Sequence, residues 1–270
     1  MTYELGIIGA GNMAEAIARG VLRAGLFLPA QIIASDAAAQ RREFFTAELH
    51  IPATADNAQV ARQSKVILLS VKPQQMAGAL AALGPASNPE TLFISIAAGI
   101  SCAFIERHLG GDTNWRIVRA MPNTPMLVGE GMVGIARGAH ATDSDLAHAR
   151  NIFESAATVI EVEEEKIDAV TALSGSGPAY FFYLVEQMIA AGAALGLTHE
   201  QSRQLATRTA VGSARMLATS PDSPQELRRK VTSPGGTTEA AITSMETAGV
   251  GPAIVEAIKA AQRRGTELGT

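Results

Sequence analysis

A short glycine turn near the start of the chain carries the first chemistry that the sequence can support. Residues 9–14 read GAGNMA, a G-x-G-x-x-A pattern that follows the apolar residues 5–8 and precedes a helical pattern. Gly9 permits the tight turn, Gly11 has no Cβ and lets a pyrophosphate approach the backbone, and Ala14 allows the helix to pack closely on the strand. The free amides and the positive dipole end of that helix would hold the phosphates. The pattern predicts dinucleotide binding, the alternative being a tight turn in an unrelated α/β protein.

A second turn, in the last quarter of the chain, has the residue types of an anion site. Residues 233–238 read SPGGTT and lie between a helical pattern that stops and another that starts. The Pro-Gly-Gly turn exposes backbone amides that suit a carboxylate, and the threonine hydroxyls can donate to or accept from a small polar ligand. Either Thr237 or Thr238 is expected to cap the new helix. An ordinary corner between two helices is the alternative.

Alternating strand and helix patterns predict the scaffold that positions the glycine turn. Apolar runs of strand length occur at residues 31–36, 65–71, 91–96 and 115–120, with helical patterns between most of them. The alternation predicts an α/β fold with an N-terminal Rossmann-type, doubly wound parallel sheet. Ligands bind beyond the carboxyl ends of the strands in such sheets. The segments that follow strands, at residues 70–73, 97–99 and 121–125, are therefore expected to face the cofactor cleft.

An acid after the second predicted strand bears on the choice of cofactor. Asp36 lies 25 residues beyond Gly11, close to where a carboxylate would meet the adenosine ribose hydroxyls, and this favours NAD. Ser35 with the nearby Arg41 and Arg42 would instead suit a 2′-phosphate, although a solvated helix face is the more common role of such arginines. The sequence therefore leaves NADH and NADPH both open.

The pattern changes near residue 161, which marks the predicted domain boundary. An acidic run occupies residues 161–165, and the remainder of the chain has only helical patterns, broken at Pro178 in the SGSGP motif of residues 174–178. We predict a dinucleotide-binding Rossmann domain over residues 1–161. We predict an all-α dimerisation and substrate-binding domain over residues 162–270.

Composition narrows the class of protein further. The 270 residues are 47% hydrophobic and 18% charged, with a net charge of −4, and no basic stripe points to nucleic acid. The single cysteine, Cys102, fits a reducing cytosol, and there is no leader-like or membrane-spanning apolar run, so a cytoplasmic protein with no membrane association is expected. The five histidines are scattered without the spacing of metal ligands, and no metal is predicted.

Four motifs in order along the whole chain resemble those of the pyrroline-5-carboxylate reductase family. They are IGAGNM at residues 8–13, MPNTP at 121–125, ALSGSGPAY at 172–180 and LRRKVTSPGGTTEAAI at 227–242. The resemblance implies reduction of the cyclic imine 1-pyrroline-5-carboxylate to L-proline, the last step of proline biosynthesis, with NADPH or NADH. It also implies a helical domain that forms a homodimer by interleaving helices, with further assembly commonly into decamers.

The same resemblance implies roles for individual residues. The cofactor contacts that it implies are Gly9, Ala10, Gly11, Asn12, Met13, Ser35, Asn57, Ser70, Val71, Lys72, Pro73, Ala97 and Ala98. The substrate contacts that it implies are Ser233, Gly235, Gly236, Thr237 and Thr238, with Glu164 close to the bound product. Thr238 is the expected catalytic residue, its hydroxyl bonding the ring nitrogen. Asp36, included among the cofactor residues, stands where family members have Asn or Arg, which speaks against a strict NADPH preference.

Two other interpretations remain open at this stage. One is another Rossmann imine reductase or a β-hydroxyacid dehydrogenase-like enzyme; many of these use an active-site lysine, for which Lys166 is the nearest candidate in the helical half. The other is a nucleotide-sensing protein without turnover, which an intact turn at residues 233–238 argues against.

Overall fold

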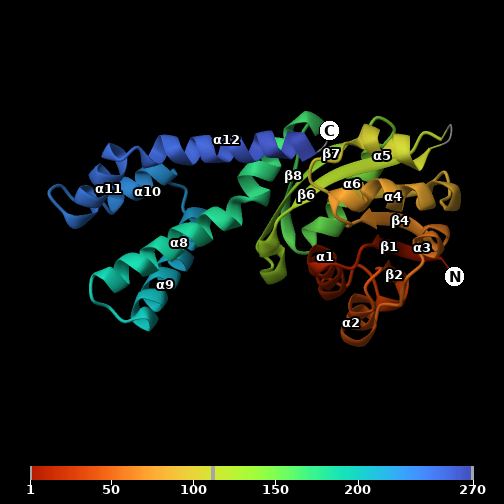
Figure 1. The fold of residues 1–270 in the computed structure, drawn as a ribbon, viewed down its shortest axis with the longest axis horizontal. Helices are drawn as coiled ribbons and strands as arrows, with labels where there is room; N and C mark the ends of the chain where they lie inside the picture. Colours follow the sequence, from red (N-terminus) through yellow and green to blue (C-terminus); the bar gives the residue numbers. More distant parts are fainter. Residues whose placement is uncertain (1, 111–112, 269–270) are drawn as a thin grey trace. The chain divides into compact units, whose positions relative to one another are not determined.

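The computed structural model describes residues 2–110 and 113–268 (Figure 1). The chain divides into two compact units, one of residues 2–176 with 261–268 and the other of residues 177–260. The functional division at residues 161 and 162 stays a prediction. Among the described residues, no helix combines the length and the apolar character that crossing a membrane requires.

The first unit is built on one sheet of eight strands in the order β3-β2-β1-β4-β5-β6-β7-β8. The strands are β1 (Tyr3–Ile8), β2 (Ile32–Ser35), β3 (Ala53–Thr54), β4 (Ser64–Leu69), β5 (Leu92–Ser95), β6 (Arg116–Pro122), β7 (Gly131–Arg137) and β8 (Ala157–Glu161). All neighbouring pairs are parallel except β6 with β7. The predicted Rossmann-type sheet is confirmed, with β1 at the point where the strand order reverses.

Three strands were not anticipated from the sequence. β3 has two residues, and β7 and β8 extend the sheet beyond the strands that apolar runs had indicated. β7 runs antiparallel to β6 because only residues 123–130 join them, and a parallel crossover needs a dozen or more residues.

Helices cover both faces of this sheet, as Figure 1 shows for α1, α4, α5 and α6. One face packs against α1 (Asn12–Arg23), α2 (Ala39–Leu49) and α6 (Asp143–Glu154), and the other against α3 (Asn57–Gln63), α4 (Pro73–Leu83) and α5 (Cys102–Leu109). Side chains alternate between the two cores along each strand: Leu68 belongs to the first core and Leu69 to the second. Burial on both faces explains the continuous apolar runs in the sequence.

The sheet is followed by α7 (Ile167–Val170) and a π-helical turn (Thr171–Gly175), which pack on the β6 and β7 region of the first unit. The second unit contains α8 (Gly177–Ala194), α9 (His199–Thr219), α10 (Pro224–Lys230), α11 (Thr237–Thr247) and the first part of α12 (Val250–Leu268). α8 and α9 pack closely, because a Cβ on Gly192 would lie 2.6 Å from the hydroxyl oxygen of Ser202. The prediction that residues after 161 form no strand is confirmed for the described residues.

Candidate active site

The glycine turn after β1 has the conformation that its residue types predict. Gly9 adopts φ +94°, and a Cβ there would lie 2.8 Å from the carbonyl oxygen of Ser70. Gly9 also donates its N–H to the carbonyl of Ser35 at 2.8 Å. Only glycine fits this position, because both the left-handed backbone and the close approach of the next strand exclude a side chain.

Gly11 has a different role in the same turn. Its φ of −75° is open to any residue, and in the described part of the chain no atom comes within 4 Å of where its Cβ would be. Gly11 is the N-cap of α1, and the first helical hydrogen bond runs from the N–H of Glu15 to its carbonyl. The amides of residues 12–14 precede that bond and have no acceptor within the helix. The turn therefore presents amide donors beside open space, which fits the pyrophosphate of a dinucleotide.

Asp36, the residue after β2, is hydrogen-bonded to this glycine turn. The Asp36 carboxylate accepts the N–H of Ala10 through Oδ2 and that of Ala38 through Oδ1, both at 2.8 Å. The hydroxyl of Ser35, which is buried, donates to the amide oxygen of Asn57 at 2.7 Å. Two separate contacts, Ser35 with Asn57 and Asp36 with Ala10, therefore place three predicted cofactor residues next to the glycine turn.

The other predicted cofactor residues follow β4 and β5. Ser70 donates its N–H to the carbonyl of Ile8 at 2.8 Å, and Pro73 is the first residue of α4. Residues 97 and 98 come just after β5. Because β2, β1, β4 and β5 are adjacent and parallel, their carboxyl ends form one edge of the sheet. The structure therefore places thirteen of the predicted cofactor residues along that one edge. They are residues 9–13, 35, 36, 70–73, 97 and 98.

The turn at residues 233–238 lies in the second unit and is described by itself. Gly235 has φ +70°, and Gly236 is the N-cap of α11. The expectation that a threonine caps this helix was wrong, because Thr237 and Thr238 are already its first two helical residues. Their amides, like that of Glu239, precede the first helical bond, from Ala240 to Gly236. The exposed amides that the sequence predicted for an anion are therefore present.

The amide of Gly235, in the same turn, is bonded to a carboxylate of the chain itself. Gly235 donates its N–H to Oε2 of Glu239 at 2.7 Å. The contact closes the turn from within, and Glu239 was not among the predicted site residues. The signal in the sequence was an acid in the first turn of a predicted helix, three residues after the second glycine of the pair.

Glu164 lies in the first unit, where it joins a charged group that the sequence reading missed. Its Oε1 accepts the N–H of Cys102 at 2.7 Å and lies 3.8 Å from a guanidinium nitrogen of Arg119. Arg119 is buried in β6 and donates to Asp168 at 2.7 Å. Asp168 also accepts from the hydroxyl of Thr266 in the last turns of α12. The missed signal was an arginine between apolar residues in the interior of a strand, Val118 before it and Ala120 after it.

The thiol of Cys102, at the start of α5, is buried. Burial, aided by the carboxylate of Glu164, raises the pKa of its thiol well above the ordinary value. Burial and the raised pKa both favour the protonated, unreactive form of the thiol.

Residues 121–125, predicted to face the cofactor cleft, are anchored by Asn123. Its side chain donates to the carbonyl of Ser174 at 3.2 Å and accepts the N–H of Met132 at 2.9 Å. Asn123 is buried, and it ties the end of β6 to the π-helical turn and to β7. π-Helical turns often occur at functional sites.

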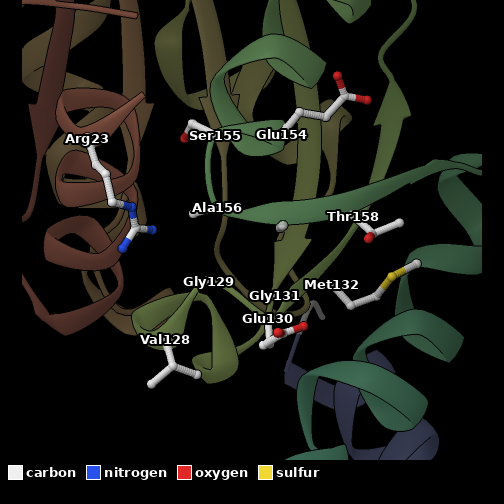
Figure 2. A pocket seen from close by; sticks show the side chains of 11 residues that line it. Arg23, Val128, Gly129, Glu130, Gly131, Met132, Glu154, Ser155, Ala156 and Thr158 are labelled. Atoms are coloured by element: carbon white, nitrogen blue, oxygen red, sulfur yellow. The ribbon is translucent and has the colours of Figure 1, made fainter. Parts of the chain in front are cut away.

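A cavity of about 730 Å³ opens elsewhere on the first unit (Figure 2). It lies among the end of α1, the β7 start and the α6–β8 connection, with Arg23, Glu130 and Glu154 on its walls. None of the predicted site residues lines it. Arg23 is the last residue of α1, about 18 Å along the helix from the glycine turn. This cavity is therefore not the cofactor site.

Comparison with known proteins agrees with this geometry. Residues 164–268 match the family model described as pyrroline-5-carboxylate reductase dimerisation, and residues 4–99 match the one described as NADP oxidoreductase coenzyme F420-dependent. The chain is 44% identical to the pyrroline-5-carboxylate reductase of Pseudomonas aeruginosa, over 99% of this chain and 97% of that protein.

Solved structures of such reductases are similar over the whole chain. The Coxiella burnetii enzyme has a TM-score of 0.90 at 36% identity, and each chain is covered completely. The Plasmodium falciparum enzyme, solved with NADP bound, has a TM-score of 0.88 at 29% identity, with 99% and 98% covered. The chain belongs to the pyrroline-5-carboxylate reductase family.

Proposed function

We propose that this protein reduces 1-pyrroline-5-carboxylate to L-proline with a reduced nicotinamide dinucleotide, as the last step of proline biosynthesis. The observation that carries the proposal is the pairing of two amide-rich turns in one chain of this family. One turn, at residues 9–14, suits a pyrophosphate, and the other, at residues 233–238, presents the amides that precede the first helical bond of α11 and suits a carboxylate. Residues 1–161 bind the dinucleotide in this account, and residues 162–270 supply the substrate contacts.

The cofactor contacts follow from the edge of the sheet described above. The amides of residues 12–14 receive the pyrophosphate, which passes over Gly11 where a side chain would block it. Ser35, Asp36 and Asn57 surround the adenosine end. Residues 70–73 and 97–98 lie farther along the same edge, toward β5, and contact the rest of the dinucleotide.

The substrate contacts follow from the second turn. The amides of residues 237–239 and the hydroxyls of Ser233 and Thr237 bind the substrate carboxylate. The hydroxyl of Thr238, which is half-buried on the first turn of α11, bonds the ring nitrogen. Glu164, which the family resemblance puts near the product, contributes by keeping the start of α5 and Arg119 in place.

The reaction depends more on the correct placement of the substrate than on a strong acid. The bound nicotinamide supplies a hydride, which the C5 carbon of the imine accepts. A protonated imine nitrogen makes this carbon a good acceptor, and simple iminium ions have a pKa near neutrality, so the substrate can arrive charged. Thr238 then stabilises the nitrogen through a hydrogen bond as the nitrogen loses its charge.

We also propose that the working form is a homodimer with interleaved helices, which assembles further into a decamer. α8 supports this, because only Gly177 of its 18 residues is buried, although the helix is strongly apolar. The exposed side chains include those of Phe181, Phe182 and Tyr183. An exposed apolar surface of this kind is typical of an interface with another protein chain. The single unpaired cysteine supports a cytoplasmic location.

The test is turnover by the purified full-length protein, followed by the loss of reduced-nicotinamide absorbance. We expect rapid oxidation of NADH or NADPH with 1-pyrroline-5-carboxylate, and little with a pyrroline that lacks the carboxylate. Turnover of a β-hydroxyacid instead would favour the rival dehydrogenase, whose lysine candidate, Lys166, is exposed in this chain. Binding of the dinucleotide without turnover of any substrate would favour the sensor.

A further inference from the structure

The carboxylate of Asp36 is held against the glycine turn by hydrogen bonds to both of its oxygens. Oδ2 accepts the N–H of Ala10, inside the turn, and Oδ1 accepts that of Ala38, both at 2.8 Å. The residue directly follows β2, where an acid binds the ribose hydroxyls of NAD in Rossmann folds. Each carboxylate oxygen has two lone pairs, so both can still accept from a ribose hydroxyl.

The two nearby arginines are turned to other partners. Arg41 donates from Nε to the carbonyl of Ala10 at 2.6 Å, pairs with Glu15 at 3.0 Å and stacks on Phe44, whose ring centre is 4.7 Å from the guanidinium carbon. These contacts fix Arg41 to the glycine turn and α1. The guanidinium group of Arg41 is thus already engaged by other groups, so it is not free to bind a 2′-phosphate.

Arg42 is fixed in the same way. One of its terminal nitrogens donates to the carbonyls of Asp36 and Ala37, both at 2.8 Å. The guanidinium thus closes the loop between β2 and α2, and its position stabilises the conformation that aims the Asp36 carboxylate at the turn.

We propose that Asp36 makes this enzyme selective for NADH over NADPH. A 2′-phosphate would place up to two negative charges beside a carboxylate that its amide partners keep in position, while the adjacent arginines are engaged by carbonyls and by Glu15. The ribose 2′-hydroxyl of NADH instead donates to that carboxylate. The inference rests on the proposed function for the identity of the dinucleotide site. It differs from the NADP named for one matching family model and for the bound Plasmodium enzyme.

Binding to the full-length protein, measured by calorimetry, tests the preference without turnover. The ligands are NADH and NADPH, and then 5′-ADP and 2′,5′-ADP, which isolate the adenosine end. We expect NADH to bind at least about tenfold more tightly than NADPH, and the ADP pair to show the same order. Added salt should reduce the ratio of NADH to NADPH affinity, because screening weakens the repulsion between solvent-exposed charges.

Two variants separate the charge from the fold. Asp36→Asn and Asp36→Ser both remove the negative charge, and each should raise NADPH affinity and lower NADH affinity, so that the ratio shifts by about tenfold or more. Asp36→Asn leaves one backbone amide facing an NH₂ group, so thermal melting of both variants is compared with the wild type. Glu48→Gln, an exposed acid on α2, is the charge-matched control and should leave the ratio unchanged.

Equal or tighter binding of NADPH by the wild type would overturn the proposal, as would a ratio that neither neutral variant changes. These outcomes can be told apart from a failure of the proposed function. If the protein binds NADH more tightly but never reduces the pyrroline, the proposed function is refuted and the cofactor preference stands. A protein that reduces the pyrroline equally well with both cofactors refutes only the preference.

Discussion

Glu239 accepts the amide N–H of Gly235 across 2.7 Å, so a carboxylate of the chain itself rests on the turn at residues 233–238. Gly235 has a positive φ, and α11 begins two residues later. The contact holds the turn in the conformation that presents the following amides, those of Thr237 and Thr238, to a ligand. Glu239 therefore stabilises the turn that we propose binds the substrate.

Replacing Glu239 by Ala should weaken substrate binding. The turn loses an acceptor for the Gly235 amide and becomes more mobile, so KM for the pyrroline is expected to rise about three- to tenfold, since a bond to a charged partner contributes roughly 1.5 kcal/mol or less when exposed. Glu246→Ala removes a second exposed acid on α11, in a 3.7 Å pair with Arg228, and should leave KM unchanged. A lower KM in Glu239→Ala would show instead that this carboxylate competes with the substrate.

Thr238 is predicted to act through its hydroxyl alone. Thr238→Val keeps the branched shape and should lower kcat at least about tenfold, which corresponds to ~1.4 kcal/mol of transition-state stabilisation. Thr238→Ser restores a hydroxyl and should recover most of the activity. Steady-state kinetics with saturating cofactor measure both, and wild-type turnover in the valine variant would remove Thr238 from the mechanism.

The two glycines of the cofactor turn should respond oppositely to alanine. Gly11→Ala places a methyl group in open space, so the free energy of unfolding should change by no more than about 0.5 kcal/mol while dinucleotide affinity falls tenfold or more. Gly9→Ala meets the Ser70 carbonyl at 2.8 Å with φ at +94°, and should lower stability by at least ~1–3 kcal/mol. Urea unfolding and calorimetry on both variants check this. Unchanged affinity in a folded Gly11→Ala would contradict the pyrophosphate assignment.

These two glycines also show how far the sequence predicts the structure. The G-x-G-x-x-A pattern, with an apolar strand before it, is sufficient to place the turn at the end of β1, because local backbone requirements determine it. The runs that became β2, β4, β5 and β6 were equally clear, since strands buried on both faces are continuously apolar. Because a parallel sheet was predicted, the sequence also predicted that the segments after these strands lie at one edge of the sheet.

What the sequence did not predict depends on contacts between distant residues. β7 and β8 were missed because Gly131 and Gly134 interrupt the pattern of β7 and only Val159 of β8 is buried. The interior arginine in β6 looked like an exception to an apolar run until its partner, Asp168, was seen 49 residues away. The helix cap at Gly236 was misassigned because a capping threonine and a threonine in the first turn look alike in sequence.

The buried thiol of Cys102 predicts a pH dependence of stability. Burial, with the Glu164 carboxylate second, raises the thiol pKa above its ordinary value of about 9. The native state keeps the proton where the unfolded chain loses it. The contribution of this site is therefore complete below about pH 9 and declines as the pH rises, by up to ~1.4 kcal/mol per pH unit.

Urea unfolding at a series of pH values, for the wild type and Cys102→Ala, measures this effect. The wild type should lose stability above about pH 9 faster than the variant, because other alkaline titrations are common to both proteins. Parallel curves for the two proteins would show that the thiol is not the cause.

The most direct test follows the hydride itself. Reduced dinucleotide dideuterated at C4 of the nicotinamide is incubated with the full-length protein and 1-pyrroline-5-carboxylate, and the product is examined by NMR. The account predicts L-proline that carries one deuterium, at C5. Deuterium at another carbon, a product other than proline, or loss of the label to water would contradict it.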